Sequence, residues 1–154
     1  MARDFEIIVA NRQRTRRLDC KFIKQLAQKV LADIGVENVE LGVHFVSAQE
    51  MARVHEQFMN IPGSTDVITF DHSSKPPANL QGEIFISVED AIAQARDFKT
   101  TWQSETARYV IHGILHLLGF DDVEPGSRKK MKQAENRLVK RMAAQFDLRA
   151  IEKK

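Results

Sequence analysis

Residues 103–122 read QSETARYVIHGILHLLGFDD, and this stretch sets the architecture that we expect. Apolar residues recur in it at the three- and four-residue spacing of an α-helix, which predicts a helix over residues 103–118. Toward its C-terminal end this helix is apolar on nearly every side, so we expect it to be buried beneath other elements. A buried helix of this kind indicates a layered domain, in which helices pack against a sheet.

Strand and helix patterns alternate along the rest of the chain. Alternating apolar residues or β-branched runs predict strands over residues 5–9, 39–45, 65–70 and 82–88. Helical spacing predicts further helices over residues 20–34, 48–58 and 89–98, and from 125 onward. Residues 73–82 contain two prolines and two serines and are predicted to be a loop. We therefore expect an α+β fold over a single domain, residues 1–154, with a small mixed β-sheet packed against several helices.

Local signals mark where these helices begin and end. Asp19 is a favourable N-cap for the first helix, and Gly35 is expected to end it. Ser47 and Glu50 form an S-x-x-E capping box, which predicts the start of the second helix. The pair Pro62–Gly63 is expected to end that second helix.

Composition and charge narrow the class of protein. Hydrophobic residues at 43% and charged residues at 29% are ordinary for a globular protein. No apolar run approaches the roughly 20 residues that span a bilayer, and the N-terminal stretch does not resemble a secretory signal. The single cysteine, Cys20, cannot form an internal disulfide, so we expect a cytoplasmic protein.

The net charge of +2 does not by itself indicate nucleic-acid binding, but the basic residues are unevenly placed. Two stretches hold most of them: Arg12, Arg14, Arg16, Arg17, Lys21 and Lys24 in one, and Arg128, Lys129, Lys130, Lys132, Arg137, Lys140 and Arg141 in the other. Such runs occur on ordinary solvated faces and also on surfaces that bind RNA phosphates.

His112 and His116 are the candidate metal ligands. Residues four apart share one face of a helix, about 6 Å apart along its axis, so both imidazoles can reach one ion. Two histidines on a buried helix can also simply hydrogen-bond within the core. Gly119 is expected to end the helix in the left-handed conformation and to bring Asp121 or Asp122 back as a third ligand. Three protein ligands with an open fourth position are typical of a catalytic zinc site.

Gly113 bears on the type of reaction. It occupies the position at which H-E-x-x-H peptidases carry their glutamate base, which argues against a peptidase. A glycine is also expected to leave room beside the metal for a bulky substrate group. A small zinc hydrolase or peptidase stays an alternative, as does a non-haem iron oxygenase, whose metal is held by two histidines and a carboxylate.

Residues 112–122, HGILHLLGFDD, closely resemble the signature of the YbeY family, H-G-x-L-H-L-x-G-Y-D-H. Residues 65–70, TDVITF, resemble its P-T-D/N-V-L-S-F segment, and residues 82–86, GEIFI, are similar to its G-D-I-x-I strand. The resemblance implies a zinc-dependent endoribonuclease with one Zn²⁺ per chain, which hydrolyses single-stranded RNA. It further implies a role with the small ribosomal subunit, in 16S rRNA 3′-end maturation and ribosome quality control.

The resemblance carries His112 and His116 over as metal ligands, which would act in catalysis through the bound metal and water. The family's third histidine falls on Asp122, and a carboxylate can bind zinc at about 2.0–2.2 Å, so the implied site is His112, His116 and Asp122. An oxygen ligand would make manganese, iron or magnesium more competitive than a site of three histidines does.

Other family positions differ in this chain. An arginine that holds RNA phosphate in the family falls on Met59, and a proline falls on Ser64. Arg53 or Arg108 would have to supply the missing positive charge. His72 follows a strand and could reach the metal or the substrate, although a lone loop histidine is usually exposed. These departures leave open an RNA- or ribosome-binding protein of the same fold with reduced catalysis.

Overall fold

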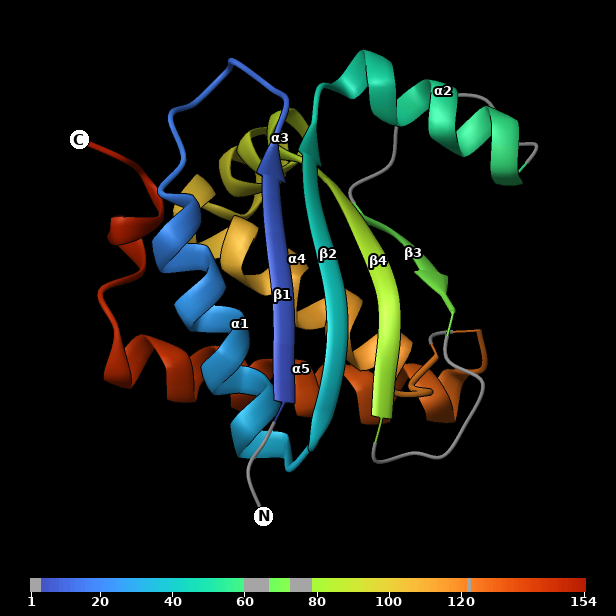
Figure 1. Cartoon of the computed structure of the whole chain (residues 1–154). Helices are drawn as coiled ribbons and strands as arrows, with labels where there is room; N and C mark the ends of the chain where they lie inside the picture. Colours follow the sequence, from blue (N-terminus) through green and yellow to red (C-terminus); the bar gives the residue numbers. More distant parts are fainter. Residues whose placement is uncertain (1–3, 60–66, 73–78, 122) are drawn as a thin grey trace.

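The computed structural model describes residues 4–59, 67–72, 79–121 and 123–154 (Figure 1). In chain order its elements are β1 (Asp4–Asn11), α1 (Cys20–Ile34), β2 (Asn38–Val46), α2 (Ala48–Met59), β3 (Val67–Asp71), β4 (Asn79–Ser87), α3 (Val88–Phe98), α4 (Trp102–Leu117), α5 (Pro125–Gln145) and a short 3-10 helix (Leu148–Ile151). The predicted α+β class is confirmed.

The strands form one mixed sheet in the order β1-β2-β4-β3. β1, β2 and β4 run parallel, and β3 pairs antiparallel with β4. β4 begins at Asn79, so the prediction that the loop extends to Gly82 is wrong for its last residues. Their backbone pairs with β2, starting from Asn38 opposite Asn79, and Leu80 is buried in the core. This long-range pairing outweighs the local turn signal of the prolines.

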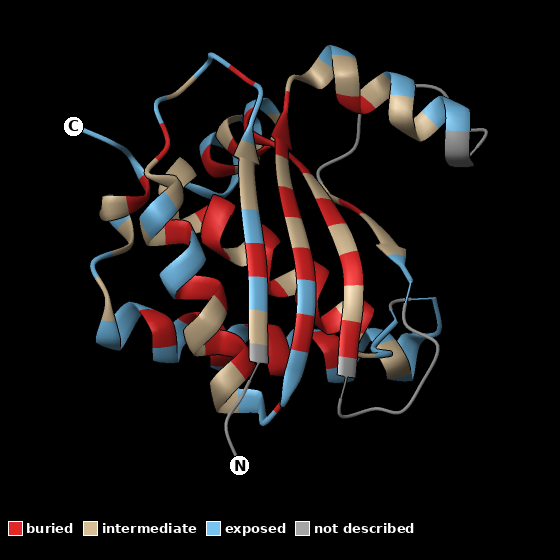
Figure 2. Ribbon diagram, in the orientation of Figure 1, coloured by how far each residue is buried: buried red, intermediate tan, exposed pale blue. Residues whose placement is uncertain are grey.

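One face of the sheet is covered by helices (Figures 1 and 2). α1 packs against β1, α4 packs against β3 and β4, and α3 and α5 pack on α4. Val110, Ile111 and Ile114 of α4 are completely buried, as its all-round apolar character predicted. The contact between α4 and β4 is close, because a Cβ atom added to Gly113 would lie 2.7 Å from Cγ2 of Ile84. The expectation that Gly113 leaves room for a substrate group is therefore wrong, since Ile84 fills that space.

Among the described elements, α2 covers the other face of the sheet, at one end only (Figure 1). A small apolar cluster of Val46, Met51 and Ile68 lies there, separate from the main core. Elsewhere this face, called the open face below, is exposed enough that the side chain of Ile8 is 62% accessible. No helix in the described part of the chain is long and apolar enough to cross a membrane.

The predicted helix boundaries hold where they can be followed. The Asp19 side chain accepts a hydrogen bond from the Phe22 N–H, and Gly35 ends α1 with φ +96°. Ser47 Oγ accepts from the Glu50 N–H at 3.0 Å, as the capping box predicted. Residues 62 and 63, predicted to end α2, lie outside the described residues.

Candidate functional site

The last two turns of α4 bring His112 and His116 together. Their ring centroids are 4.7 Å apart and the ring planes are inclined at 76°. Both side chains are partly exposed, although the helix that carries them is largely buried. The spacing of four residues thus places two imidazoles side by side at the surface end of a core helix.

α4 ends in the way that Gly119 predicted. Gly119 has φ +101°, a conformation that only glycine adopts readily. Its N–H donates to the His116 carbonyl, and the Phe120 N–H donates to the Leu115 carbonyl, each at 3.0 Å. This pair of bonds is a Schellman motif, which reverses the chain directly after the second histidine.

The two candidate third ligands follow this turn. Asp121 is exposed, and its Oδ1 accepts a hydrogen bond from the Val123 N–H at 3.2 Å. Asp122 lies outside the described residues. Within the described ranges, no group of three or more histidine, cysteine, aspartate or glutamate side chains could hold a metal ion. A site formed by His112, His116 and Asp122 therefore stays a prediction.

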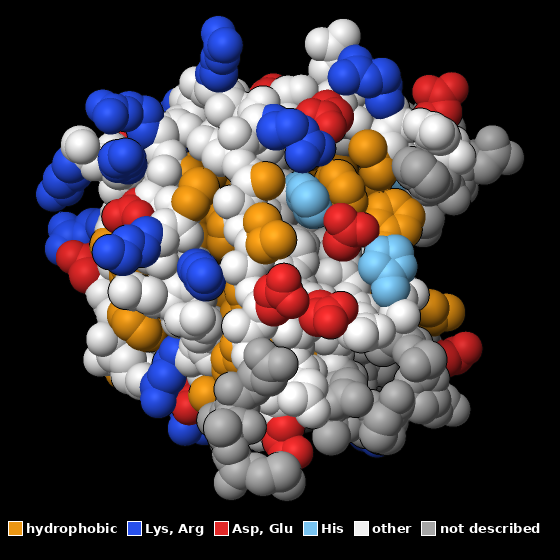
Figure 3. All heavy atoms as spheres, viewed as in Figure 1, with side chains coloured by type: hydrophobic (Ala, Val, Ile, Leu, Met, Phe, Trp, Pro, Cys, Tyr) orange, Lys and Arg blue, Asp and Glu red, His pale blue; other side chains and the backbone are white. Residues whose placement is uncertain are grey.

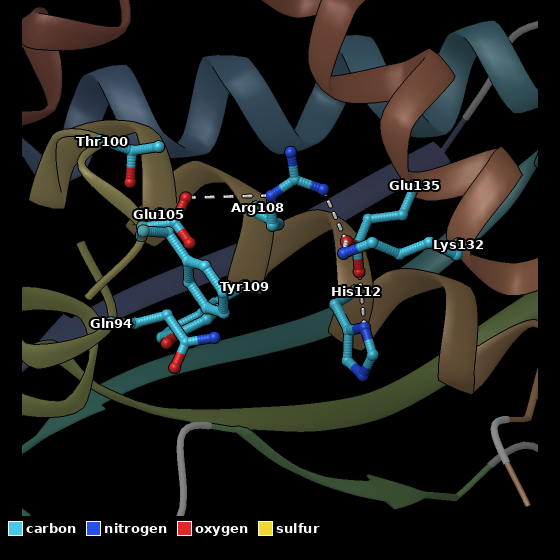
Figure 4. Close-up of a pocket in the computed structure, with 9 residues that line it drawn as sticks. Gln94, Thr100, Glu105, Arg108, Tyr109, His112, Lys132 and Glu135 are labelled. Carbon is cyan, nitrogen blue, oxygen red and sulfur yellow. Dashed lines mark hydrogen bonds and ion pairs between the residues drawn. The ribbon is translucent and has the colours of Figure 1, made fainter. Parts of the chain in front are cut away.

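His112 is held from behind by a buried carboxylate of α5 (Figure 4). Glu135 is only 4% exposed, and its Oε1 lies 2.6 Å from Nδ1 of His112. An ionised carboxylate can only accept, so Nδ1 of His112 carries a proton, and in the neutral imidazole this is the only ring N–H. The Nε2 lone pair of His112 is then available for a metal, in the carboxylate–histidine arrangement that commonly orients metal ligands.

Two cations stabilise this carboxylate in its charged form. Glu135 Oε2 lies 2.6 Å from Arg108 Nη1 and 3.4 Å from Lys132 Nζ. Burial alone would raise the pKa of Glu135, but hydrogen bonds from His112 and Arg108, with the charges of His112 and Lys132, outweigh it and lower the pKa to about 2. Glu135 is therefore ionised throughout the neutral range.

Arg108 is committed to this network. Besides Glu135 it contacts Asn136 Oδ1 at 2.7 Å and Glu105 Oε2 at 3.8 Å. This position makes it a less suitable replacement for the family arginine than the sequence suggested. Arg53, the other candidate, is exposed on α2. Met59 is the last residue of α2, and its side chain lies outside what the structure describes.

Sequence reasoning did not identify Glu135, although a signal was present. It is the only acidic residue between 125 and 145, and it falls on the apolar stripe of α5, between Met131 and Leu138. A single carboxylate on the core-facing side of a basic helix needs a buried partner. Here the partners are Arg108 and His112.

A second histidine–carboxylate cluster lies on the open face of the sheet (Figure 3). Glu83 of β4 accepts from both sides, with Oε1 2.9 Å from His44 Nε2 and Oε2 3.0 Å from His72 Nε2. α4 packs on the opposite face, against Ile84, so His72 is directed to Glu83 and not to the histidine pair of α4. Its side chain is 56% exposed.

The comparisons with known proteins agree with this fold. The family model for Endoribonuclease YbeY matches residues 8–143, which is most of the chain. The chain belongs to the YbeY family. YbeY of Bacteroides fragilis is 35% identical over 124 residues, covering 80% of this chain and 85% of the relative. YbeY of Chlorobium phaeovibrioides is 30% identical over 122 residues, covering 79% and 81%. The resemblance found in the sequence motifs is confirmed.

A solved structure gives the same result for the YbeY fold. The solution structure of TM1509 from Thermotoga maritima matches with a TM-score of 0.68 and 26% sequence identity. The match covers 96% of each chain, so it includes the sheet and the helices on its covered face. His112, His116 and Glu135 all lie within the residues that the YbeY family model spans.

Proposed function

We propose that this chain is a metal-dependent endoribonuclease that hydrolyses single-stranded RNA, with one zinc ion held by His112, His116 and Asp122. The observation that carries the proposal is the 2.6 Å contact between His112 Nδ1 and the buried Glu135, beside a second histidine on the same helix face. A histidine that only fills the core needs neither an ionised carboxylate behind it nor a partly exposed second histidine on the same helix face. Ligand histidines usually have such a partner.

Each residue around His112 has a separate role in this proposal. Glu135 fixes the tautomer and the ring orientation of His112, while Arg108 and Lys132 keep Glu135 ionised. The Schellman motif at Gly119 reverses the chain directly after α4. The third ligand of the proposed site, Asp122, belongs to the segment that follows this turn. Zinc, when bound, would act as a Lewis acid toward a phosphodiester and lower the pKa of a water molecule.

The substrate class is proposed from the family and from charge. The matched relatives carry the name endoribonuclease, and basic residues of α5 lie next to His112. We place the activity in the cytoplasm, in 16S rRNA 3′-end maturation and ribosome quality control with the small ribosomal subunit. Peptidase chemistry is disfavoured, because a glutamate at position 113 would collide with Ile84.

Metal content and RNA cleavage test the proposal together. The protein is purified without added metal or chelator, as wild type, as Asp122→Ala and as Asp121→Ala, which is the control with the same change in charge. We expect about one zinc per chain in wild type and Asp121→Ala, and a strong loss in Asp122→Ala. His112→Ala and His116→Ala should abolish cleavage of a single-stranded RNA.

Each other outcome points to a different account. If Asp121→Ala loses the metal and Asp122→Ala does not, the third ligand is Asp121 and not Asp122. Iron in place of zinc, with an oxygen requirement, would favour the oxygenase. Tight RNA binding without metal-dependent cleavage would support the binding-protein alternative, which the changed residues at Met59 and Asp122 make worth testing.

A further inference from the structure

An RNA-cleaving site needs positive charge beside the reacting phosphate, and the structure shows which cations near His112 are available for it. Arg108 is occupied by Glu135, Asn136 and Glu105. Lys132 touches Glu135 at 3.4 Å, yet its side chain remains 65% exposed. Arg128 and Lys129 are exposed, and neither forms an ion pair with any residue in the described ranges.

These three available cations share one pocket with His112. The pocket, called the α5 pocket here, has a volume of about 620 Å³ and is lined by His112, Arg128, Lys129, Met131, Lys132 and Glu135, with Pro125 at one edge. Arg128 and Lys132 are four residues apart, about 6 Å along the helix axis, and therefore face the same side of α5. Lys130 lies between them in sequence but does not line the pocket.

A second pocket on the other side of His112 has a different charge. It has a volume of about 300 Å³ and includes Arg108, Lys132, Glu105 and Glu135 among its lining residues (Figure 4). Its two cations are balanced by its two carboxylates, whereas the α5 pocket has three cations and one carboxylate. A phosphate chain is therefore attracted to the α5 side of His112.

We propose that Arg128, Lys129 and Lys132 form the subsite that binds the RNA backbone next to His112. This inference rests on the proposed function, and it supplies the phosphate contact that the family arginine, which falls on Met59, cannot make here. Lysine and arginine contacts of this kind bind phosphates with little base specificity, and their affinity falls with salt. Lys132 lines both of the pockets that His112 lines, whereas Arg128 and Lys129 line the α5 pocket and not the other.

The test measures binding separately from cleavage. A fluorescent single-stranded RNA of about 12 nucleotides is titrated with the full chain in the presence of EDTA, at several salt concentrations, and fluorescence anisotropy is recorded. The test variant is Arg128→Gln/Lys129→Gln/Lys132→Gln. The control is Lys130→Gln/Arg137→Gln/Lys140→Gln, which removes the same charge from exposed positions of the same helix outside the α5 pocket.

We expect the test variant to lose affinity at least about tenfold and its salt slope to fall by about 2, since each phosphate contact on a single strand contributes about 0.7. The control should lose less than about threefold. Equal losses in both variants, or none in the test variant, would overturn the subsite. Because Lys132 contacts Glu135, the double variant Arg128→Gln/Lys129→Gln is measured as well, and wild-type affinity in a folded double variant would also overturn it.

Cleavage by the wild type is assayed in parallel, with zinc or manganese added. Wild-type cleavage together with unchanged binding by the test variant would remove the subsite and leave the proposed function intact. An absence of cleavage together with the expected binding pattern would retain the subsite and remove the proposed function.

Discussion

Glu135 and Glu83 each contact histidine, the first inside the molecule and the second at its surface. The Glu135 side chain is 5% exposed and lies 2.6 Å from both His112 and Arg108. The Glu83 side chain is 41% exposed and lies 2.9 Å from His44 and 3.0 Å from His72. The two clusters differ in the amount of water around the charge, and the Glu135 cluster also includes the cations Arg108 and Lys132.

Burial changes what such a contact is worth. Around an exposed pair, water screens the attraction, and the net gain is about 0–1 kcal/mol. In a buried cluster the charges depend on one another, so removing one partner leaves the others uncompensated and costs several kcal/mol. The pKa of Glu83 is lowered chiefly by the hydrogen bond from His72, then by His44, while its partial burial acts in the opposite direction. The Glu135 cluster is therefore expected to hold its histidine more rigidly than the Glu83 cluster does.

The largest difference is expected when each carboxylate is removed. Glu135→Ala should lower the free energy of unfolding by about 3 kcal/mol, because Arg108 and His112, which are partly buried, lose their buried acceptor. Glu83→Ala should lower it by less than about 1 kcal/mol. Urea denaturation of the two metal-free variants measures both values. Equal losses would show that burial does not separate the clusters.

The free energy of unfolding should depend on pH more strongly through Glu135 than through Glu83. The pKa of Glu135 is about 2 in the folded chain and 4.5 ordinarily, so its contribution to stability is complete above pH 4.5 and is lost as the pH falls toward 2. The integrated loss is about 3 kcal/mol at 1.36 kcal/mol per pKa unit. Denaturation of metal-free protein between pH 6 and pH 3 should show a shallower pH dependence for Glu135→Gln than for wild type or Glu83→Gln. A parallel dependence for all three would contradict the assignment.

The interaction energies of two arginine–glutamate pairs, one buried and one at the surface, test the effect of burial directly. A double-mutant cycle on Arg108 and Glu135 should give an interaction of about 1.5 kcal/mol or more. The matched surface pair, Arg12 and Glu50, has a similar distance of 2.7 Å, but its side chains are 45% and 26% exposed. We expect less than about 0.5 kcal/mol from the same cycle there. A larger surface value would mean that geometry outweighs burial.

The smallest effect is expected at His72. Its side chain is 56% exposed, so His72→Ala should change the free energy of unfolding by no more than about 0.5 kcal/mol. Thermal or urea denaturation is sufficient to detect a larger effect. A loss above about 1 kcal/mol would show that the surface cluster is more rigid than its exposure indicates.

Features that depend on neighbouring residues could be predicted from the sequence, whereas those that depend on distant segments could not. Short-range signals were sufficient for α4, for the cap at Asp19 and for the helix end at Gly119, because each depends on neighbours within about five residues. The side-by-side placement of His112 and His116 was predictable for the same reason. The strand order, the early start of β4 at Asn79 and the role of Glu135 depend on pairing or packing between distant segments. No local pattern contains that information, although the isolated charge on the apolar stripe of α5 is a clue.

Position 113 shows how a single close contact can limit the evolution of a protein. A Cβ atom there would lie 2.7, 2.8 and 3.0 Å from three side-chain atoms of Ile84. A glutamate could enter only if Ile84 became smaller at the same time, and a smaller residue alone would leave a cavity in the core. Each of the two substitutions, made alone, is therefore expected to destabilise the core. A chain that acquired the general base of a peptidase at position 113 would therefore pass through a single mutant of lower stability.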